Sequence, residues 1–404
     1  MKPKSKESIV IIGGGPAAMM LACTLDPILF DVTIVEKGKA IGRKFLVAGK
    51  GGFNLTHSED IDKMIEKYEG PKSLLDSLSS FTNNDLRHWL SSIGIETYIG
   101  SSKRVFPIKG IKPIAVLRAI KKEIERKGIT LLKETLWYGS FIENSSIQLL
   151  HKEKNISLKA DKVIFALGGG SWKITGSDGC WLPHFKKNNV ATLPFRPSNC
   201  AMCINWPENV KVHFGKPIKN IALTYNDTYI KGEMMVTKHG IEGSPAYALS
   251  YYVGNELESK KSITVFVDLK PSLSLEKVNS ILSKSHKKIS KLLRDELSLS
   301  STAVALIKSA TTREEFNDVK LLTHCIKKLP LSIIGLEEID NAISTVGGIK
   351  STAMDKHFEL INFPNHYTIG EMINWNAPTG GYLLQGCLSM GYALGKYLNK
   401  EHQI

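Results

Sequence analysis

A glycine-rich turn near the start of the chain constrains the fold more than any other feature. The apolar run Ser8–Ile12 is typical of a buried parallel strand, and the turn Gly13-Gly14-Gly15-Pro16-Ala17-Ala18 follows it directly. A helix-compatible segment, Met19–Leu25, and a second strand, Val32–Val35, come next, and this strand ends at Glu36. The order of strand, G-x-G-x-x-A turn, helix, strand and acid predicts a Rossmann-like α/β domain that binds a dinucleotide.

The residue types in this turn each have a physical reason. Gly13 permits a tight turn, Gly15 lets the backbone approach a pyrophosphate, and Ala18 allows close packing of helix on strand. The N-terminus of the helix then faces the phosphate charge. We expect Glu36 to accept hydrogen bonds from a ribose, and an acid at this position disfavours NADP in this site because it would repel a 2′-phosphate.

The next segment favours FAD over NAD. Residues 37–56 read KGKAIGRKFLVAGKGGFNLT, with five glycines and five basic residues in 20 positions. Backbone N–H groups together with Arg43 and Lys44 could contact a long anionic cofactor. A flexible surface loop is the alternative, but the apolar residues in the segment, such as Phe45 and Phe53, favour burial.

The net charge of +14 raises the question of an anionic partner such as nucleic acid, a membrane surface or a nucleotide. Residues 1–190 carry 29 basic and 19 acidic side chains, so most of the excess lies in the segment that begins the nucleotide site. A lysine-rich, solvated surface is the simpler explanation for the remainder. No apolar run is long enough to predict a transmembrane helix, so no membrane association is expected.

The six cysteines are sparse for 404 residues, which predicts a reducing, cytoplasmic location without a disulfide framework. Cys200 and Cys203 form a lone C-x-x-C flanked by Pro197 and Pro207, as in a loop or short strand. A structural role is favoured over a redox or metal-binding role, and no metal site is predicted.

At this point the sequence resembles a known family. Gly42-Arg43-Lys44 followed by Gly49-Lys50-Gly51-Gly52-Phe53-Asn54-Leu55-Thr56 is similar to the signature of the aminoacetone-oxidase-like, or BaiN/RdsA-like, FAD-dependent oxidoreductases. Further segments resemble the family in the same order: 163–169, 175–179, 232–241, 347–354, 370–371 and 379–385. The resemblance covers essentially the whole chain, with one departure: Asn374 and Asn376 stand where the family usually has acids.

The resemblance implies a split domain plan. A Rossmann-like FAD-binding domain would comprise residues 1–190 and 345–404, with an insert at 191–344. The insert would hold a small β-barrel, at about 191–270 and 329–344, and a helical part at about 271–328. A closing helix is expected from Gly381 to Leu398, with its N-terminus near the flavin or the pyrophosphate.

The motif and the resemblance together predict a set of cofactor contacts. The residues are Gly13, Gly15, Pro16, Ala17, Ala18, Glu36, Lys37, Gly42, Arg43, Lys44, Gly51, Asn54, Thr56, Leu136, Ala166, Gly168, Gly169, Gly370, Glu371, Gly380, Gly381, Tyr382 and Leu383.

Three residues of the glycine-rich loop, Lys44, Lys50 and Asn54, are candidates for tuning the flavin, and His239 is a candidate for facing a substrate. Phosphate contact, solvent exposure or simple packing is the competing interpretation for each of them. No catalytic acid or base is predicted.

The predicted activity is that of an FAD-dependent oxidoreductase whose flavin accepts hydride or electrons from NAD(P)H or a small organic substrate. A second complete dinucleotide unit is missing from the sequence, so it does not reveal an NAD(P)H site. The alternative is a flavin-containing protein associated with nucleic acid, either RNA-modifying or redox-sensing. The insert carries a net charge of only +4 and no RNA-binding signature, which disfavours nucleic acid. A flavin-binding protein without turnover is a third possibility.

Overall fold

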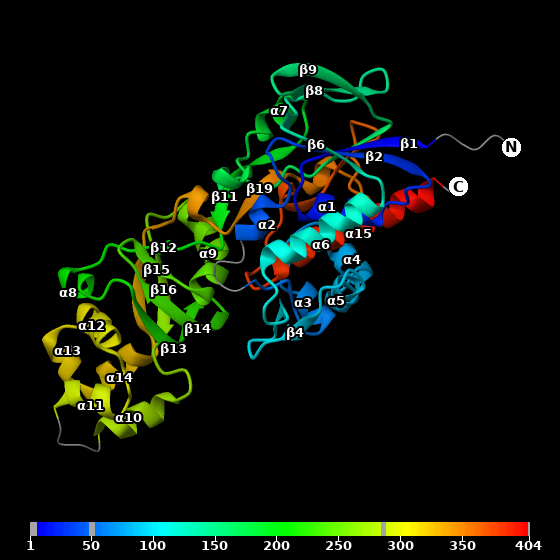
Figure 1. The fold of residues 1–404 in the computed structure, drawn as a ribbon. Coiled ribbons are helices and arrows are strands. Elements are labelled where there is room, and N and C mark those ends of the chain that lie inside the picture. Colours follow the sequence, from blue (N-terminus) through cyan, green and yellow to red (C-terminus); the bar gives the residue numbers. More distant parts are fainter. Residues whose placement is uncertain (1–5, 48–52, 284–287, 403–404) are drawn as a thin grey trace. The chain divides into compact units, whose positions relative to one another are not determined.

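The computed structural model describes residues 6–47, 53–283 and 288–402, and the chain divides into two compact units. The first unit consists of Met1–Arg196 and Ser344–Ile404, and the second of Pro197–Ile343. The first unit is therefore assembled from two stretches of chain that are separated by the whole of the second, as the colours of Figure 1 show.

A five-stranded parallel sheet forms the centre of the first unit, in the order β20-β10-β1-β2-β6. Ile12 at the end of β1 pairs with both Val35 of β2 and Phe165 of β10. These strands consist largely of buried apolar residues, as expected for a sheet that is covered on both faces. The strands are β1 (Glu7–Ile12), β2 (Phe30–Glu36), β6 (Thr130–Lys133), β10 (Lys162–Phe165) and β20 (His366–Thr368).

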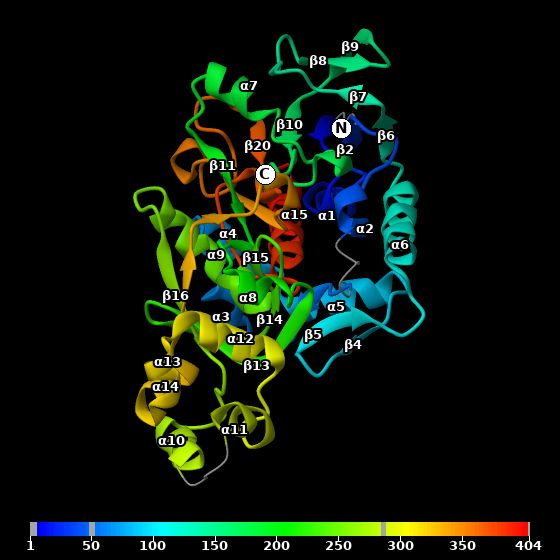
Figure 2. The same cartoon turned by 90° about the vertical axis from the view of Figure 1, so that its left-hand side faces the viewer.

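Three helices cover one face of this sheet, and a small antiparallel sheet covers the other (Figures 1 and 2). The helices are α1 (Pro16–Thr24), α6 (Pro113–Arg126) and α15 (Tyr382–Glu401). The small sheet contains β7 (Thr135–Leu136), β8 (Ser146–His151) and β9 (Lys154–Lys159). Helices α1 and α15 pack so closely that a Cβ at Gly391 would lie 2.3 Å from the carbonyl oxygen of Ala17. The two ends of the chain are thereby joined in one core.

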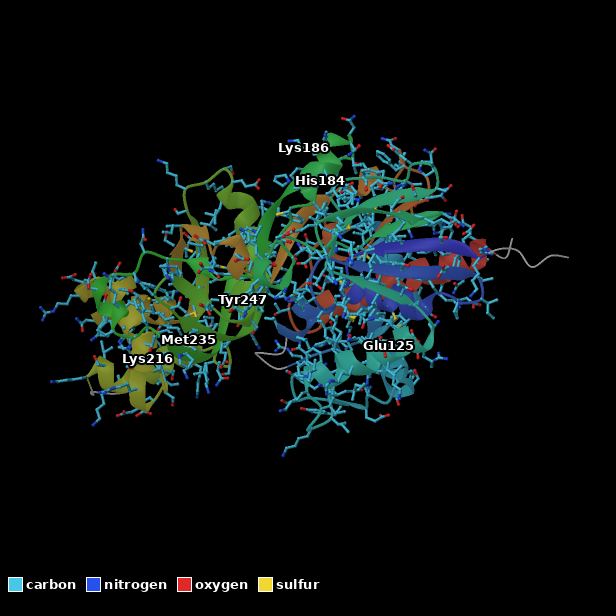
Figure 3. All side chains as sticks on the ribbon, turned by 45° about the horizontal axis from the view of Figure 1, so that its top comes forward. Glu125, His184, Lys186, Lys216, Met235 and Tyr247 are labelled. Atoms are coloured by element: carbon cyan, nitrogen blue, oxygen red, sulfur yellow. The ribbon has the colours of Figure 1, made fainter. Side chains whose placement is uncertain are left out.

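Shorter elements complete the first unit. A second small sheet has the order β3-β5-β4, and β11 pairs with β19 at the passage to and from the second unit. Their bounds are α2 (Arg43–Val47), β3 (Thr56–His57), α3 (Ile61–Ile65), α4 (Lys72–Ser80), α5 (Asn83–Ser92), β4 (Thr97–Ile99), β5 (Arg104–Pro107), α7 (Leu182–Lys187), β11 (Thr192–Ser198) and β19 (Ser344–Ile349). Glu125 of α6 and Lys186 of α7 are exposed on this unit (Figure 3).

The second unit combines a seven-stranded antiparallel sheet with helices around its own core. The sheet order is β17-β16-β13-β14-β15-β12-β18. Its strands are β12 (Met202–Cys203), β13 (Lys216–Tyr225), β14 (Thr228–Val236), β15 (Gly240–Glu242), β16 (Ile263–Asp268), β17 (Leu329–Ile333) and β18 (Gly335–Leu336). Its helices are α8 (Glu208–Lys211), α9 (Ser244–Leu257), α10 (Leu275–Ser283), α11 (Ile289–Asp295), α12 (Ser301–Ala310), α13 (Arg313–Asn317) and α14 (Val319–Lys327).

A largely buried ion pair fixes the helical part to the sheet within the second unit. The Lys327 ammonium lies 2.6 Å from the Asp268 carboxylate and also donates to the carbonyl oxygens of Lys270 and Leu273. The carboxylate therefore has a cation beside it, and the carbonyl groups of the loop after β16 have a donor.

The strands and the helix of the glycine-turn motif lie where the sequence predicts them. The strand expected at Ser8–Ile12 is β1, the strand expected at Val32–Val35 lies within β2, and the helix expected at Met19–Leu25 overlaps α1. The insert, for which a small β-barrel was expected, holds a seven-stranded antiparallel sheet with β17 and β18 at its two edges. The expected closing helix is α15, which begins at Tyr382 and continues to Glu401. Among the described residues, no helix is long and apolar enough to cross a membrane.

Candidate functional site

The site lies at the carboxyl edge of the parallel sheet, where β1 and β10 end side by side. Gly13, directly after β1, has a φ of +104°, and a Cβ there would lie 2.3 Å from the carbonyl oxygen of Ala166. The Ala166 N–H in turn donates to the carbonyl oxygen of Ile12 over 2.8 Å. Only glycine fits this crossing of two backbones, which explains the first glycine of the motif.

The N-terminus of α1 faces open space at this edge. Gly15 is the N-cap residue, it has no side-chain capping bond, and a Cβ built on it would have no atom within 4 Å. Pro16 occupies the first turn and has no N–H, while Ala17 and Ala18 are buried against the core. The helix therefore presents its positive end and backbone donors to a cradle that an anionic group can fill.

Glu36 at the end of β2 organises the turn. Its carboxylate accepts the N–H of Gly14 over 3.0 Å and the N–H of Gly38 over 2.7 Å. The Gly14 carbonyl oxygen accepts the N–H of Gly42 over 2.8 Å, so the predicted ribose acid and the glycine-rich loop are tied to one turn. A carboxylate has about four acceptor positions, so two remain for ribose hydroxyl groups.

The basic residues that the sequence assigned to the cofactor each have a protein partner. Lys37 lies 2.7 Å from the Asp178 carboxylate, and Arg43 donates to the carbonyl oxygen of Ile174 over 2.6 Å. These contacts join the glycine-rich loop to the segment after β10. Asp178 was not among the predicted site residues, although it lies in the family-like segment 175–179.

Lys44 joins this loop to the C-terminal motif. Its ammonium lies 2.8 Å from the Glu371 carboxylate and donates to the Ser171 hydroxyl over 3.0 Å. Glu371 also accepts the N–H of Thr345 over 3.2 Å. Gly169 lies beside them, since a Cβ there would be 2.9 Å from the carboxyl carbon of Glu371. Four polar residues therefore surround the end of β10. Lys44 and Glu371 were predicted from the sequence, and Ser171 and Thr345 were not.

The C-terminal motif reaches the same edge through two glycine turns. A Cβ at Gly370 would contact Ala17 of α1 at 3.1 Å. Gly381 has a φ of +106°, and a Cβ there would lie 2.5 Å from the backbone of Thr56. The Thr56 hydroxyl donates to the Gln385 side chain over 2.8 Å. The N-terminus of α15 and the end of the glycine-rich loop are therefore held together.

The other predicted contacts are distributed as follows. The Gly168 carbonyl oxygen accepts the Trp181 indole N–H over 2.9 Å, and Gly380 packs against the Arg104 guanidinium. Tyr382 is buried at the start of α15, and Leu383 and Asn54 are partly buried. Leu136 in β7 is 43% exposed. Gly51 and Lys50 lie outside the described residues.

The structure explains why asparagine can occupy position 374, where the family usually has an acid. Its side-chain oxygen accepts the N–H of Gly347 over 2.8 Å, and its own N–H donates to the carbonyl oxygen of Ile349. The amide thus fixes the returning strand β19 to the C-terminal motif. Acceptance by an oxygen needs no negative charge, so asparagine meets this requirement as well as an acid would.

In the second unit, neither the candidate substrate residue His239 nor the Cys200–Cys203 pair forms a recognisable functional site among the described residues. His239 is exposed, and its carbonyl oxygen accepts the N–H of Ile204. Cys200 and Cys203 are both free thiols, and burial raises the pKa of Cys200 to about 12, so this thiol stays protonated at neutral pH. Within the described part of the chain, no group of three His, Cys, Asp or Glu residues could hold a metal ion.

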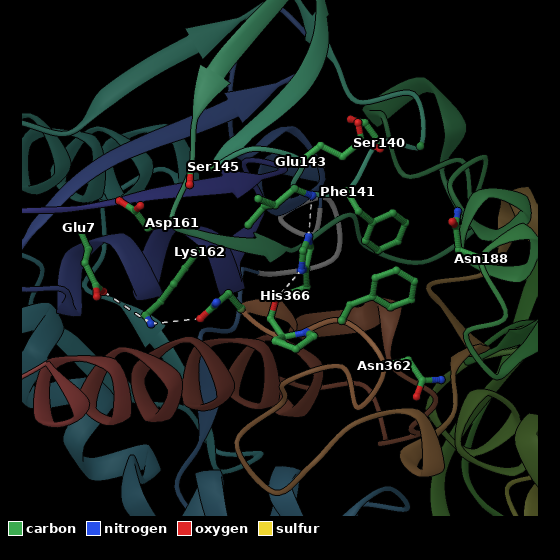
Figure 4. A pocket seen from close by; sticks show the side chains of 16 residues that line it. Glu7, Ser140, Phe141, Glu143, Ser145, Asp161, Lys162, Asn188, Asn362 and His366 are labelled. Carbon is green, nitrogen blue, oxygen red and sulfur yellow. Dashed lines mark hydrogen bonds and ion pairs between the residues drawn. The ribbon is translucent and has the colours of Figure 1, made fainter.

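A polar pocket lies at the opposite, amino edge of the parallel sheet (Figure 4). Its volume is roughly 680 Å³, and Glu7, Lys162 and His366 line it where β1, β10 and β20 begin. Phe141 stacks on Phe363 at 4.3 Å in its wall. This hollow is separate from the glycine turns, and none of the predicted cofactor residues lines it.

The fold and the carboxyl-edge site define a Rossmann-type FAD-binding protein. The HI0933-like protein Rossmann domain matches residues 7–397, so the chain belongs to the HI0933-like family. This finding agrees with the resemblance inferred from the sequence motifs.

Several characterised proteins are similar over nearly their whole length. The 3-dehydro-bile acid delta(4,6)-reductase of Clostridium scindens is 24% identical, with 96% of this chain and 98% of that protein covered. The ribosomal RNA dihydrouridine synthase of Haemophilus influenzae is 23% identical, with 97% and 98% covered. Among solved structures, the 3-ketosteroid-delta4-(5alpha)-dehydrogenase of Rhodococcus jostii RHA1 has a TM-score of 0.51 at 12% identity, with 98% and 97% covered. That structural likeness supports the fold.

The cradle at Gly15, the positive end of α1 and the remaining acceptor capacity of Glu36 fit the pyrophosphate and ribose of FAD. Together with the family, they identify FAD as the cofactor and the protein as an FAD-dependent oxidoreductase.

Proposed function

We propose that this oxidoreductase saturates a carbon–carbon double bond conjugated to a carbonyl group, with NAD(P)H as the source of electrons. One observation carries the proposal: the full-length relatives have two different substrates but one kind of reaction. The name of the Clostridium scindens protein describes reduction at the 4,6 double bonds of a 3-oxo steroid acid. The names of the Haemophilus influenzae and Escherichia coli proteins describe saturation of uridine in ribosomal RNA.

The two substrates share an electronic feature. In each, the double bond to be saturated is conjugated to a carbonyl group, which makes the far carbon electrophilic toward hydride. FAD, when bound, supplies that hydride. The chain itself must bind the phosphates, orient the flavin, exclude water and provide a proton for the second carbon. In this proposal the α1 N-terminus receives the phosphates, and Glu36, which already accepts the Gly14 and Gly38 N–H groups, receives the ribose.

A surface beside the C-terminal motif favours RNA as a second candidate substrate. In β4, Tyr98 and Ile99 are each 48% exposed, and Tyr98 stacks on Phe106 of β5 at 5.7 Å. Lys103 and Lys109 are exposed on the same hairpin. Aromatic faces among lysines suit stacking on unpaired bases and contact with phosphates. Because β5 begins at Arg104, which packs against Gly380, this basic hairpin adjoins the predicted cofactor turn.

The test begins with the purified protein and its flavin spectrum under anaerobic conditions. We expect NADH or NADPH to bleach the oxidised flavin band at ~450 nm, and a conjugated enone to restore it. Two probes are then compared: androsta-4,6-diene-3,17-dione and a ribosomal RNA transcript that contains uridine. Restoration by either probe, with the saturated product identified by mass spectrometry, supports the proposal. Failure of both probes to restore the band contradicts it.

The variant Tyr98→Ala separates the two substrates. Loss of a stacking platform should weaken turnover of RNA and leave turnover of the steroid unchanged. The variant Tyr252→Ala, which alters a tyrosine that is also exposed but belongs to the second unit, is the matched control. The reducing location that sparse, free cysteines indicate is consistent with a cytoplasmic enzyme that meets NAD(P)H and RNA.

A further inference from the structure

Four titratable side chains meet at the first turn of α15: His57, Glu59, Lys67 and Tyr382. The Lys67 ammonium lies 2.5 Å from the Glu59 carboxylate and donates to the Tyr382 hydroxyl over 3.0 Å. The Tyr382 hydroxyl donates to the same carboxylate. The His57 ring stacks on the Tyr382 ring at 5.3 Å, with its Nδ1 atom 3.7 Å from Glu59. The four groups form one connected polar network.

Buried groups that are not themselves charged hold this network in place. Asn83, which is 3% exposed, donates from its side-chain amide to the carbonyl oxygens of His57 over 2.7 Å and Glu59 over 2.8 Å. The buried Tyr68 hydroxyl donates to the carbonyl oxygen of Tyr382 over 2.6 Å. The geometry of the network therefore depends on the core and not on surface loops.

The network holds one ion pair and two neutral proton carriers at neutral pH. Burial alone would raise the pKa of Glu59, but the hydrogen bonds from Lys67 and Tyr382 bring it below its ordinary value, so the group is ionised. Burial and the bond to Glu59 raise the pKa of Tyr382, which keeps the phenol protonated. Burial lowers the pKa of His57, and its Nδ1 accepts the Glu59 N–H over 3.2 Å, which leaves the ring proton on Nε2.

The exposed fractions of the side chains differ along the network, so it has a solvent-facing end and a buried end. The Lys67 side chain is 43% exposed, whereas that of Glu59 is 11% exposed and Tyr382 is 4% exposed overall. Lys67 is thus the member that exchanges protons with bulk water, and Tyr382 is the inner member. Tyr382 directly follows Gly380 and Gly381, the turn predicted to hold the cofactor.

We propose that this network supplies the proton for the reduction, with Tyr382 as the catalytic acid and Lys67 as the group that recharges it. This inference rests on the proposed function. When hydride from the reduced cofactor forms a C–H bond at the carbon remote from the carbonyl, the π bond breaks and its electron pair moves toward the carbonyl. The Tyr382 O–H bond then breaks, and its proton forms a C–H bond at the adjacent carbon.

The remaining steps restore the starting state. The phenolate left on Tyr382 takes a proton from the Lys67 ammonium, and the neutral amine takes one from water. Glu59 and His57 are positioning residues, since they hold the Tyr382 hydroxyl and the Lys67 ammonium within contact distance. The overall balance is one hydride and one proton added across one double bond, with NAD(P)H oxidised.

The experiment compares Tyr382→Phe and Lys67→Ala with the wild-type protein loaded with FAD. The control variant is Lys72→Ala, because Lys72 is also ion-paired but 85% exposed and lies on α4. Tyr382→Phe removes only the hydroxyl that contacts Glu59 and Lys67 and keeps the ring and the backbone turn at the predicted cofactor contact. We therefore expect both network variants to bind FAD, measured by flavin fluorescence, and to be reduced by NAD(P)H at the wild-type rate. Reoxidation by androsta-4,6-diene-3,17-dione should slow by about 10²–10⁴-fold in Tyr382→Phe, as for loss of a general acid.

Two further readouts separate proton supply from a merely structural role. Added methylammonium should restore reoxidation in Lys67→Ala in proportion to its concentration and have no effect on Lys72→Ala. Carbon-13 NMR of labelled tyrosine provides the second readout, without any turnover. The Tyr382 signal, assigned by its loss in Tyr382→Phe, should shift in Lys67→Ala and stay in place in Lys72→Ala.

The outcomes are distinguishable. If the wild-type protein reduces neither of the two alkene probes, the proposed function is wrong. In that case the NMR experiment still decides whether Lys67 and Tyr382 are coupled. An unmoved Tyr382 signal in Lys67→Ala overturns the network. Wild-type reoxidation in Tyr382→Phe, or a parallel loss of FAD affinity in both variants, overturns the assignment of Tyr382 as the acid.

Discussion

The two edges of the parallel sheet differ in the groups that they offer a ligand, and the groups at the carboxyl edge suit a nucleotide. At the carboxyl edge, the N-terminus of α1 has no side-chain cap and Gly15 faces open space. At the amino edge, the pocket is lined by side chains. His366 accepts the Ile142 N–H over 2.9 Å, and its other ring nitrogen lies 2.9 Å from the Pro364 carbonyl oxygen. The buried Oε2 atom of Glu7 accepts no hydrogen bond from the described residues, although the Lys162 ammonium lies 3.6 Å away.

This difference lies in the kind of group that each edge presents. The amino-edge pocket is large, but Lys162 in its floor lies within 3.6 Å of the Glu7 carboxylate, as Figure 4 shows. The carboxyl edge offers backbone donors and a helix dipole that can bind an anion without losing existing bonds. Backbone N–H donors at a helix N-terminus distinguish the cofactor edge from a pocket that is lined by side chains.

The largest expected effect is that of Gly15→Asp. A carboxylate at the α1 N-terminus would occupy the phosphate cradle and repel the pyrophosphate, so FAD binding should be lost. Aspartate is a favourable N-cap, so the free protein should melt at or above the wild-type temperature. Gly15→Asn is the control, because it has nearly the same shape without the charge and should retain more binding. Equal FAD affinity of Gly15→Asp and wild type would refute this placement of the cofactor.

Glu36→Gln should weaken FAD binding by about tenfold to a hundredfold, which corresponds to the ~1.5–3 kcal/mol typical of hydrogen bonds to a charged group. The amide keeps one acceptor oxygen but loses the other, so it cannot serve Gly14, Gly38 and a ribose together. Fluorescence titration with FAD measures the change. Glu7→Gln, at the amino edge of the same sheet, should bind FAD as wild type does; a loss there as large as that of Glu36→Gln would remove the distinction between the edges.

Gly391→Ala should destabilise the protein by about 1–3 kcal/mol, the usual cost of overpacking. The new methyl group would press on the Ala17 carbonyl oxygen and separate α15 from α1. Alanine is the better helix former, so propensity alone predicts the opposite sign. Urea unfolding measures the free energy. Gly386→Ala, whose methyl would meet only side chains, at 3.0 Å or more, should cost less.

The smallest effect concerns His366 and pH. Burial lowers the pKa of His366 below its ordinary 6.5, so folding excludes the proton that the unfolded chain binds. The resulting stability is fully present above pH 6.5 and is lost as the pH falls toward the lowered folded-state pKa. His366→Gln should therefore show a flatter fall in melting temperature between pH 7.5 and pH 5.5, with FAD affinity unchanged. A slope identical to that of the wild type would mean that His366 carries no such linkage.

The local part of the cofactor site could be predicted from the sequence because its signals are local. Gly13, Gly15 and Glu36 lie within one strand–turn–helix–strand unit, and each residue type follows from a steric or hydrogen-bonding need. The basic residues were harder to interpret. The sequence predicted that Lys44 contacts the cofactor. The structure shows that Lys44 also pairs with Glu371, which lies 327 positions away in the chain. Composition alone cannot indicate such a pair.

The proton network was missed for the same reason. Tyr382 was predicted as a cofactor contact, but nothing in the sequence brings Glu59 and Lys67 to it across more than 300 residues. The only available signal was that His57 directly follows the family-like segment ending at Thr56. The predicted cofactor contacts stay predictions, and two of the residues involved, Gly51 and the candidate Lys50, also lie outside the described residues.

By itself, the sequence determined the parallel-strand core, the glycine turn, the acid at the end of β2 and the family, because hydrophobic periodicity and turn chemistry are properties of neighbouring residues. Tertiary structure alone decided which charges meet. The packing of α15 on α1 brings the C-terminal motif to the glycine-rich loop and sets Tyr382 beside Glu59 and Lys67. The physical reason is that an ion pair or a hydrogen bond depends on distance in space, which the position of a residue along the chain does not specify.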